Sequence, residues 1–197
     1  QVTRSFVVDK ATPILQFDED IVKTFGDAPF SVRAVDMWGR EISYSSLTEH
    51  VCAVRGDVVS ILAAGDCIIR ATAIETNQFN QSVIDKTITV AKAMQFINVD
   101  DLPEKISFSS VSVTLRATAA STSDVVFRTV TPAVCRVENS NQLYMAAHGS
   151  CQLMASAAED NNYFATELSH TIEILADTDS DGIADIDDNC PAIANPR

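Results

Sequence analysis

Basic residues are scarce in this sequence. It contains 14 lysines and arginines against 27 aspartates and glutamates, which gives a formal net charge of −13. A nucleic-acid-binding surface needs positive charge opposite the phosphates, so this imbalance excludes nucleic acid as a partner. An acidic excess is instead typical of proteins that bind hard cations.

Glycine and long apolar runs are also rare. Only 6 of the 197 residues are glycine, and none belongs to a phosphate-binding loop. No apolar run approaches the ~20 residues of a membrane helix, so direct membrane insertion is not expected. No signal peptide is visible, and the sequence starts inside a strand-like segment, QVTRSFVV. We interpret the chain as part of a longer precursor.

Residues that could support catalysis are scattered along the chain. His50, His148 and His170 lie in no metal-binding or nucleophile motif, and no G-x-S-x-G sequence is present. The sequence therefore predicts no catalytic residue, and we expect the chain not to be an enzyme.

The cysteines follow a repeated pattern. Four of the five lie in two similar stretches, VCAVRGDVVSILAAGDCII and VCRVENSNQLYMAAHGSCQL, which contain Cys52 and Cys67, then Cys135 and Cys151. Each pair can form a disulfide between two flanking strands, worth roughly 3 kcal/mol, which implies an oxidising compartment. Two alternatives stay open: buried free cysteines in a cytosolic core, and a zinc site, although neither pair has the C-x-x-C spacing.

The repeat extends beyond the cysteines. The segment ATAIETNQFNQSVIDKTITV (71–90) is echoed by ASAAEDNNYFATELSHTIEI (155–174). An internal repeat of this length marks two structural units, which we place at 9–90 and 91–175. We interpret residues 1–8 as the closing strand of a preceding unit, because RSFVV resembles KTITV and HTIEI.

Both units have the sequence pattern of β-strands. Short runs such as SVRAV, EISYS and HTIEIL alternate apolar and polar residues, and turn signals such as WGR, RGD and EDNN separate them. No stretch carries a sustained helical apolar stripe. The sequence predicts an all-β fold with two tandem β-sandwich domains.

Both units resemble the bacterial immunoglobulin-like repeats found in tandem on secreted and surface proteins. The stretches that carry this resemblance are KTFGDAPFSVRA and ISYSS in the first unit, and TPAVCRV, AAHGSC and AEDNNYFAT in the second. The resemblance implies an Ig-like sandwich of about seven strands, with the two cysteines of each unit joining neighbouring strands. The second unit lacks the Gly-Asp of FGDAPF, which puts its first hairpin in doubt.

The aspartates near the C-terminus have the spacing of a calcium loop. In the twelve residues from Asp177, carboxylates occupy positions 1, 3, 5, 9 and 12, and these are Asp177, Asp179, Asp181, Asp185 and Asp188. Gly182 stands at position 6, where the loop turns sharply, and the carbonyl of Ile183 stands at position 7. The strand-like HTIEILA before the loop and Cys190 after it exclude an EF-hand.

The full pattern, D-x-D-x-D-G-I-x-D-x-x-D-N-C-P-x-x-x-N-P, resembles the thrombospondin type 3 repeat, here truncated at 176–197. This resemblance implies a bound Ca²⁺, held by the five aspartates named above and the Ile183 carbonyl, with Asp187 a weaker candidate. It also implies that Asn195 belongs to a second site, and that Cys190 pairs with a following repeat and stays unpaired in this chain. The alternative is a solvated acidic tail.

The single tryptophan lies in a turn-like stretch, DMWGRE. Trp38 can project outward and contact a sugar or a protein partner, or it can pack over its own hairpin or a neighbouring domain. We favour packing.

Taken together, these features predict a non-catalytic part of a secreted or surface-anchored bacterial protein. We expect a monomeric, calcium-stiffened and disulfide-stabilised spacer, whose partners are neighbouring domains of the same polypeptide. Two alternatives remain: an adhesin or carbohydrate-binding module that contacts a cell-surface glycan or protein, and an accessory region of a secreted enzyme or outer-membrane protein.

Overall fold

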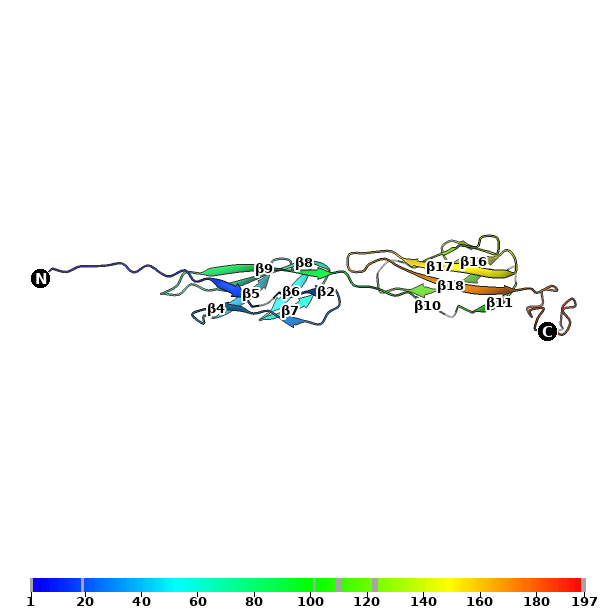
Figure 1. Ribbon diagram of the computed structural model, residues 1–197, viewed down its shortest axis with the longest axis horizontal. Coiled ribbons are helices and arrows are strands. Elements are labelled where there is room, and N and C mark those ends of the chain that lie inside the picture. Colours follow the sequence, from blue (N-terminus) through cyan, green and yellow to red (C-terminus); the bar gives the residue numbers. More distant parts are fainter. Residues whose placement is uncertain (1, 19, 101, 109–110, 122–123, 196–197) are drawn as a thin grey trace. The chain divides into compact units, whose positions relative to one another are not determined.

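The structure is a computed structural model that describes residues 2–18, 20–100, 102–108, 111–121 and 124–195. The chain divides into two compact units, Gln1–Ala93 and Met94–Arg197, each with its own hydrophobic core. Every regular element among the described residues is a β-strand, which confirms the predicted all-β fold class (Figure 1). None of these residues forms a helix that is long and apolar enough to cross a membrane.

Unit 1 is a β-sandwich. A four-stranded sheet, ordered β2-β9-β8-β5, packs against a three-stranded sheet, ordered β3-β7-β6, and a two-stranded sheet, β1-β4, completes the unit. Its strands are β1 (Leu15–Phe17), β2 (Lys23–Thr24), β3 (Phe30–Ser31), β4 (Ala34–Asp36), β5 (Ile42–Ser46), β6 (Cys52–Arg55), β7 (Val58–Ile61), β8 (Gly65–Ala73) and β9 (Ser82–Ala91).

Unit 2 is a second β-sandwich. Its four-stranded sheet is ordered β11-β18-β17-β14, its three-stranded sheet is ordered β12-β16-β15, and β10 pairs with β13. The strands are β10 (Asn98–Val99), β11 (Lys105–Ser107), β12 (Val113–Thr114), β13 (Ala117–Thr118), β14 (Val126–Thr129), β15 (Cys135–Glu138), β16 (Gln142–Met145), β17 (Gly149–Ala157) and β18 (Thr166–Leu175).

The two units share one topology, strand for strand. In each, a long antiparallel hairpin forms the centre of the larger sheet: β8 with β9 in unit 1, and β17 with β18 in unit 2. In each, the second strand of that hairpin also pairs in parallel with a short strand near the start of the unit, β2 or β11. The internal repeat in the sequence is therefore a repeat of three-dimensional structure.

The cores follow from the alternation of side chains along these hairpins. On β17, Cys151, Leu153 and Ala155 are buried every second residue, and β8 buries its matching positions in the same way. Successive side chains of a strand point to opposite faces, so one face of the hairpin packs against the smaller sheet.

The glycine that stands two residues before the second cysteine of each pair, in AAGDC and AAHGSC, has a conformational role. Gly65 and Gly149 open β8 and β17 with φ angles of 131° and 126°, a region that side chains with a Cβ rarely adopt. The chain thereby turns into the strand that carries the second cysteine of each pair.

The N-terminal segment forms no strand in this structure. Residues 2–10 are exposed throughout and carry no regular element, while Gln1 lies outside the described residues. The interpretation of residues 1–8 as a closing strand stays a prediction at this point.

Candidate calcium-binding site

The aspartate-rich loop begins directly after β18 and folds back on the end of that strand. The backbone amide of Asp185 donates a hydrogen bond of 2.8 Å to the carbonyl of Ala176, and Ala184 is buried. Ser180 and Gly182 have positive φ angles of 62° and 97°, which reverse the chain direction within a few residues. The loop is thus fixed to the sandwich of unit 2 at its start and at its middle.

Three of the predicted ligands converge at this turn. Asp177, Asp179 and Asp181 each offer a carboxylate oxygen, and these oxygens all lie within 4.8 Å of one another. Burial raises the pKa of Asp179, and three neighbouring carboxylates raise it further, although the amide of Asp181 donates a hydrogen bond to it. A cation among these carboxylates would cancel this repulsion.

The loop backbone shapes the cluster. The two oxygens of Asp177 accept hydrogen bonds from the amides of Ser180 and Gly182, at 2.8 and 3.0 Å. Asp181 accepts a bond of 2.8 Å from the amide of Ile183. These short-range hydrogen bonds hold the carboxylates in place. Among the described residues, no lysine or arginine side chain contacts these carboxylates.

Asp188 is not one of the three converging aspartates, but it is linked to them by its charge and through Asn195. Its charge acts on Asp179, and its Oδ1 accepts hydrogen bonds from the Cys190 amide and the Asn195 side chain, at 2.9 and 2.8 Å. The amide of Asn195 donates to Asp181 at 2.8 Å. Asn195, which the sequence assigned to a second site, here joins the two ends of the loop.

Two buried carboxylate oxygens of these aspartates accept no hydrogen bond from any residue that the structure describes. They are Oδ2 of Asp179 and Oδ2 of Asp188. A buried anionic oxygen without a partner is costly, and each such group needs a physical explanation. The donor set consists of hard carboxylate oxygens, so a hard divalent cation such as Ca²⁺ fits both the charge and the missing contacts.

The structure does not bring Asp185 into the cluster. Both of its oxygens accept hydrogen bonds of 2.7 Å from Thr178, one from the amide and one from the hydroxyl. The hydrogen bond from the Thr178 hydroxyl lowers the pKa of Asp185 most, and the bond from the Thr178 amide lowers it further. Burial raises this pKa in part, and the charge of His148 lowers it again. Thr178, at the second position of the loop, is the sequence signal for this different use of Asp185.

The remaining predicted residues lie outside the cluster. Asp187 and Cys190 are exposed, and Cys190 has a free thiol. Ile183 is placed next to the cluster through its amide, and the ligand role of its carbonyl stays a prediction.

Both predicted disulfides are present in the structure. Cys52 is bonded to Cys67, and Cys135 to Cys151, and all four side chains are buried. The bonded strands, β6 with β8 and β15 with β17, belong to different sheets. Each disulfide therefore bridges the two layers of its sandwich and does not join strands that are paired in one sheet.

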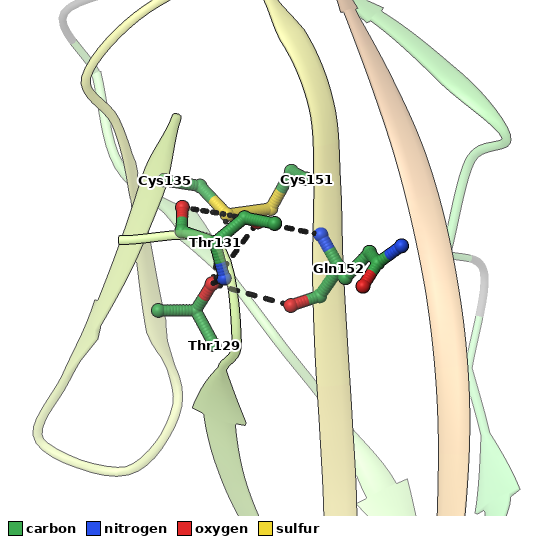
Figure 2. The surroundings of a disulfide bond; sticks show 5 residues. All are labelled: Thr129, Thr131, Cys135, Cys151 and Gln152. Carbon is green, nitrogen blue, oxygen red and sulfur yellow. Dashed lines mark hydrogen bonds between the residues drawn. A yellow bond between two sulfur atoms is a disulfide. The ribbon is translucent and has the colours of Figure 1, made fainter. Parts of the chain in front are cut away.

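Hydroxyl groups surround each disulfide, a feature that the sequence reasoning missed. Figure 2 shows Thr129 and Thr131 beside Cys135, with the Thr129 hydroxyl 3.2 Å from the sulfur. The Thr131 hydroxyl accepts a bond of 2.9 Å from the amide of Gln152 on β17. It thus ties the loop before the first cysteine to the strand that carries the second.

Unit 1 repeats this arrangement. The hydroxyl of Thr48 accepts a bond of 2.9 Å from the amide of Ile68, and the hydroxyl of Ser46 lies 3.4 Å from the sulfur of Cys52. The sequence signal is the repeated pattern S/T-x-T-x-x-x-C, present as SLTEHVC and TVTPAVC.

Trp38 lies in the turn after β4 and is half exposed, at 50%. Its ring packs against Phe79 with a centroid distance of 5.1 Å, and the guanidinium of Arg40 lies over the same phenyl ring. Arg40 also forms a buried ion pair with Asp36, at 2.6 Å. The indole is therefore used in part for packing within unit 1, and about half of the residue stays exposed to solvent.

No protein-family model matches the chain, and no curated protein matches it. Among solved structures, domains 4 to 9 of the surface layer protein SbsC are 14% identical, with a TM-score of 0.38, over 83% of this chain. Domains EC1–3 of Drosophila N-cadherin are also 14% identical, with a TM-score of 0.35, over 84% of this chain. The chain spans 30% of the first structure and 64% of the second.

A third similar structure is that of the titin domains z1z2 in complex with telethonin. It is 13% identical, with a TM-score of 0.41, over 86% of this chain and 100% of that one. These likenesses concern β-sandwich architecture. Identities and TM-scores at this level identify neither a family nor a function.

Proposed function

We propose that this chain is a non-catalytic spacer segment of a secreted or surface-anchored bacterial protein, and that its C-terminal loop binds Ca²⁺. The observation that carries the calcium site is the group of converging carboxylates with two buried oxygens that lack a donor. The repeated, disulfide-bonded sandwich supports the spacer role.

The residues proposed to hold the ion are the three converging aspartates, Asp177, Asp179 and Asp181, together with Asp188, whose charge acts on Asp179. When bound, Ca²⁺ supplies positive charge to carboxylates that otherwise repel one another. Asp185 takes a different part in this proposal. It fixes the first turn of the loop through Thr178 and is no direct ligand.

The spacer role is supported by the way each unit resists opening. A disulfide between the layers keeps the two sheets together even when the hydrogen bonds at a sheet edge break. Disulfides of this kind persist in oxidising compartments, which supports an extracellular location. Calcium is abundant outside cells, so a weak extracellular site would be filled there.

The decisive test is calorimetric titration of the 197-residue protein with Ca²⁺, compared between two single substitutions. Asp179→Asn changes a cluster carboxylate that has a buried oxygen. Asp187→Asn makes the same charge change at an exposed residue that directly precedes Asp188 but is not itself proposed as a ligand. We expect Asp179→Asn to weaken binding at least tenfold, and Asp187→Asn to bind as the unchanged protein does.

Equal binding by both variants would place the ion elsewhere and overturn the site. An absence of binding by the unchanged protein would support the alternative of a solvated acidic tail.

A second candidate function is ligand binding at Trp38, which the half-exposed indole and the neighbouring Met37, 81% exposed, favour. Exposed aromatic rings stack on sugars. Since the sequence has a single tryptophan, its fluorescence reports on this position alone. Titration with soluble cell-wall polysaccharide would shift the emission if the ring binds sugar, and an unchanged spectrum at saturating polysaccharide would count against this candidate.

A further inference from the structure

The N-terminal segment exposes apolar side chains that a folded protein normally buries. Phe6, Val7 and Val8 are 86%, 88% and 79% exposed, and Val2 is 87% exposed. The segment carries no strand. Burying apolar side chains of this size is favourable, so a segment with this composition is suited to a packed environment.

The sequence of this segment matches the closing strand of each unit in register. RSFVVDKA, which starts at Arg4, aligns with KTITVAKA, which starts at Lys86 in β9, and HTIEIL of β18 aligns from His170. In this alignment Phe6 takes the place of Ile88, and Val8 takes the place of Val90.

Those two places are the buried ones in both units. Ile88 and Val90 are 1% and 2% exposed, and their counterparts Ile172 and Ile174 are both 1% exposed. The position between them is exposed in both strands. The segment therefore carries apolar residues at the inward positions of a closing strand, although Phe6 and Val8 are exposed in this structure.

The residues that follow the segment are already held by unit 1. The amide of Ala11 donates to the carbonyl of Gln78 at 3.0 Å, and the amide of Asn80 donates back to the carbonyl of Ala11 at 2.8 Å. The Asn80 side chain also donates to the hydroxyl of Thr12 at 2.9 Å. The strand-like part thus ends where the contacts with the sandwich of unit 1 begin, and residues 2–9 form no strand within that sandwich.

The places that a closing strand fills are occupied within this chain. In unit 1, β9 lies between β8 and β2, and in unit 2, β18 lies between β17 and β11. We infer that residues 2–9 are the closing strand of a third β-sandwich of the same topology, which binds them between its own counterparts of β8 and β2. This inference stands whether or not the aspartate loop binds Ca²⁺.

The test supplies such an open sandwich in front of the chain. Residues 94–166, which contain the strands of unit 2 up to the start of β18, are added directly before Gln1 of the full 197-residue protein. Residues 2–9 then follow at the position that the rest of β18 has in unit 2. Hydrogen exchange is measured for the amides of residues 5–9, in this extended protein and in the unchanged one.

We expect these amides to exchange freely in the unchanged protein and to be protected at least a hundredfold in the extended one. Replacing both inward residues, Phe6→Asp with Val8→Asp, should abolish the protection. The matched outward pair, Ser5→Asp with Val7→Asp, should keep it, because the outward counterpart of Val7 is the exposed Glu173.

A phenylalanine is larger than the isoleucine that it replaces, so the extended protein is also made with Phe6→Ile. Protection in either version supports the inference, and absence of protection in both overturns it. Protection of residues 5–9 in the unchanged protein would place the segment on this chain or on a second copy of it, and would overturn the inference as well.

Discussion

Replacing Cys135 and Cys151 together with alanine tests how much the disulfide contributes to unit 2. The two cysteines are 16 residues apart, and a loop of this length contributes about 3 kcal/mol in the chain-entropy model. The bond joins β15 to β17, which lie in different sheets and share no backbone pairing. Its loss therefore removes the covalent link between the layers and leaves the packing of Leu143 and Leu153 to hold them.

The expected result is a fall of about 12 °C or more in the thermal midpoint of unit 2, since 1 kcal/mol corresponds to about 4–8 °C in a domain of this size. Calorimetry gives the midpoint, and hydrogen exchange of β17 and β8 assigns it to a unit. Cys190→Ala, which removes the exposed free thiol, is the control and should leave both units unchanged.

A shift of less than about 3 °C in the double variant would refute the reasoning, because it would mean that the unfolded chain gains little freedom when the link is cut. A fall of equal size in unit 1, whose own disulfide is intact, would refute the treatment of the two units as independent.

Three further predictions concern single residues. Burial opposes ionisation of Asp36, but hydrogen bonds and the charge of Arg40 lower its pKa below the ordinary value of 3.8, so the stabilising effect of its carboxylate is present above that value and fades as the pH falls through the lowered pKa. In urea unfolding, Asp36→Asn should therefore destabilise unit 1 at pH 7, and the difference in the free energy of unfolding should shrink in acid; a difference that does not change with pH would contradict this. Gly149→Ala should lower the free energy of unfolding in urea by about 1–3 kcal/mol, because alanine rarely adopts the φ angle of 126°; a steric clash does not contribute, since the new Cβ meets nothing closer than 3.7 Å. An unchanged midpoint would show that the backbone at the start of β17 adapts to the alanine. Asn195→Ala removes the side-chain donor to Asp188 and should weaken Ca²⁺ binding about fivefold in calorimetry, as expected for one hydrogen bond. Unchanged affinity would mean that the hydrogen bond between Asn195 and Asp188 is absent when the ion is bound.

The sequence predicts the fold class and the cysteine pairing because both depend on local patterns. The alternation in HTIEIL makes a strand with Ile172 and Ile174 inside, and the recurrence of V-C-x-V and G-x-C brings the same two cysteines together in each unit. The bridging of two sheets was not predictable in this way, because sheet membership depends on long-range pairing. Strands such as β2 and β11 are two or three residues long and leave no periodic signal of their own.

The candidate site was predictable in its composition and less so in its detail. The spacing of Asp177, Asp179 and Asp181 around Gly182 places these carboxylates on one turn, as expected from the loop pattern. Asp185 fits the same pattern by position, but Thr178 offers it two donors at 2.7 Å. The loop pattern depends only on the positions of the carboxylates. It contains no information on the hydrogen bonds from a neighbouring hydroxyl that compete with metal binding.

The anchoring of the loop explains how a site of like charges can be placed at all. Burial of Ala184 and the hydrogen bond from Asp185 to Ala176 tie the middle of the loop to the end of β18, away from the clustered carboxylates. The repulsion among Asp179 and its neighbours therefore acts on a turn whose backbone is already set by contacts with unit 2. Among the described residues, the part of the loop from Asp188 to Asn195 is connected to the rest through hydrogen bonds to the aspartates themselves. In the proposed function, Ca²⁺ binding consequently orders that part of the loop and leaves the sandwich before it unchanged. A cation would thus stiffen the segment after β18 without being needed for the sandwich of unit 2 to fold.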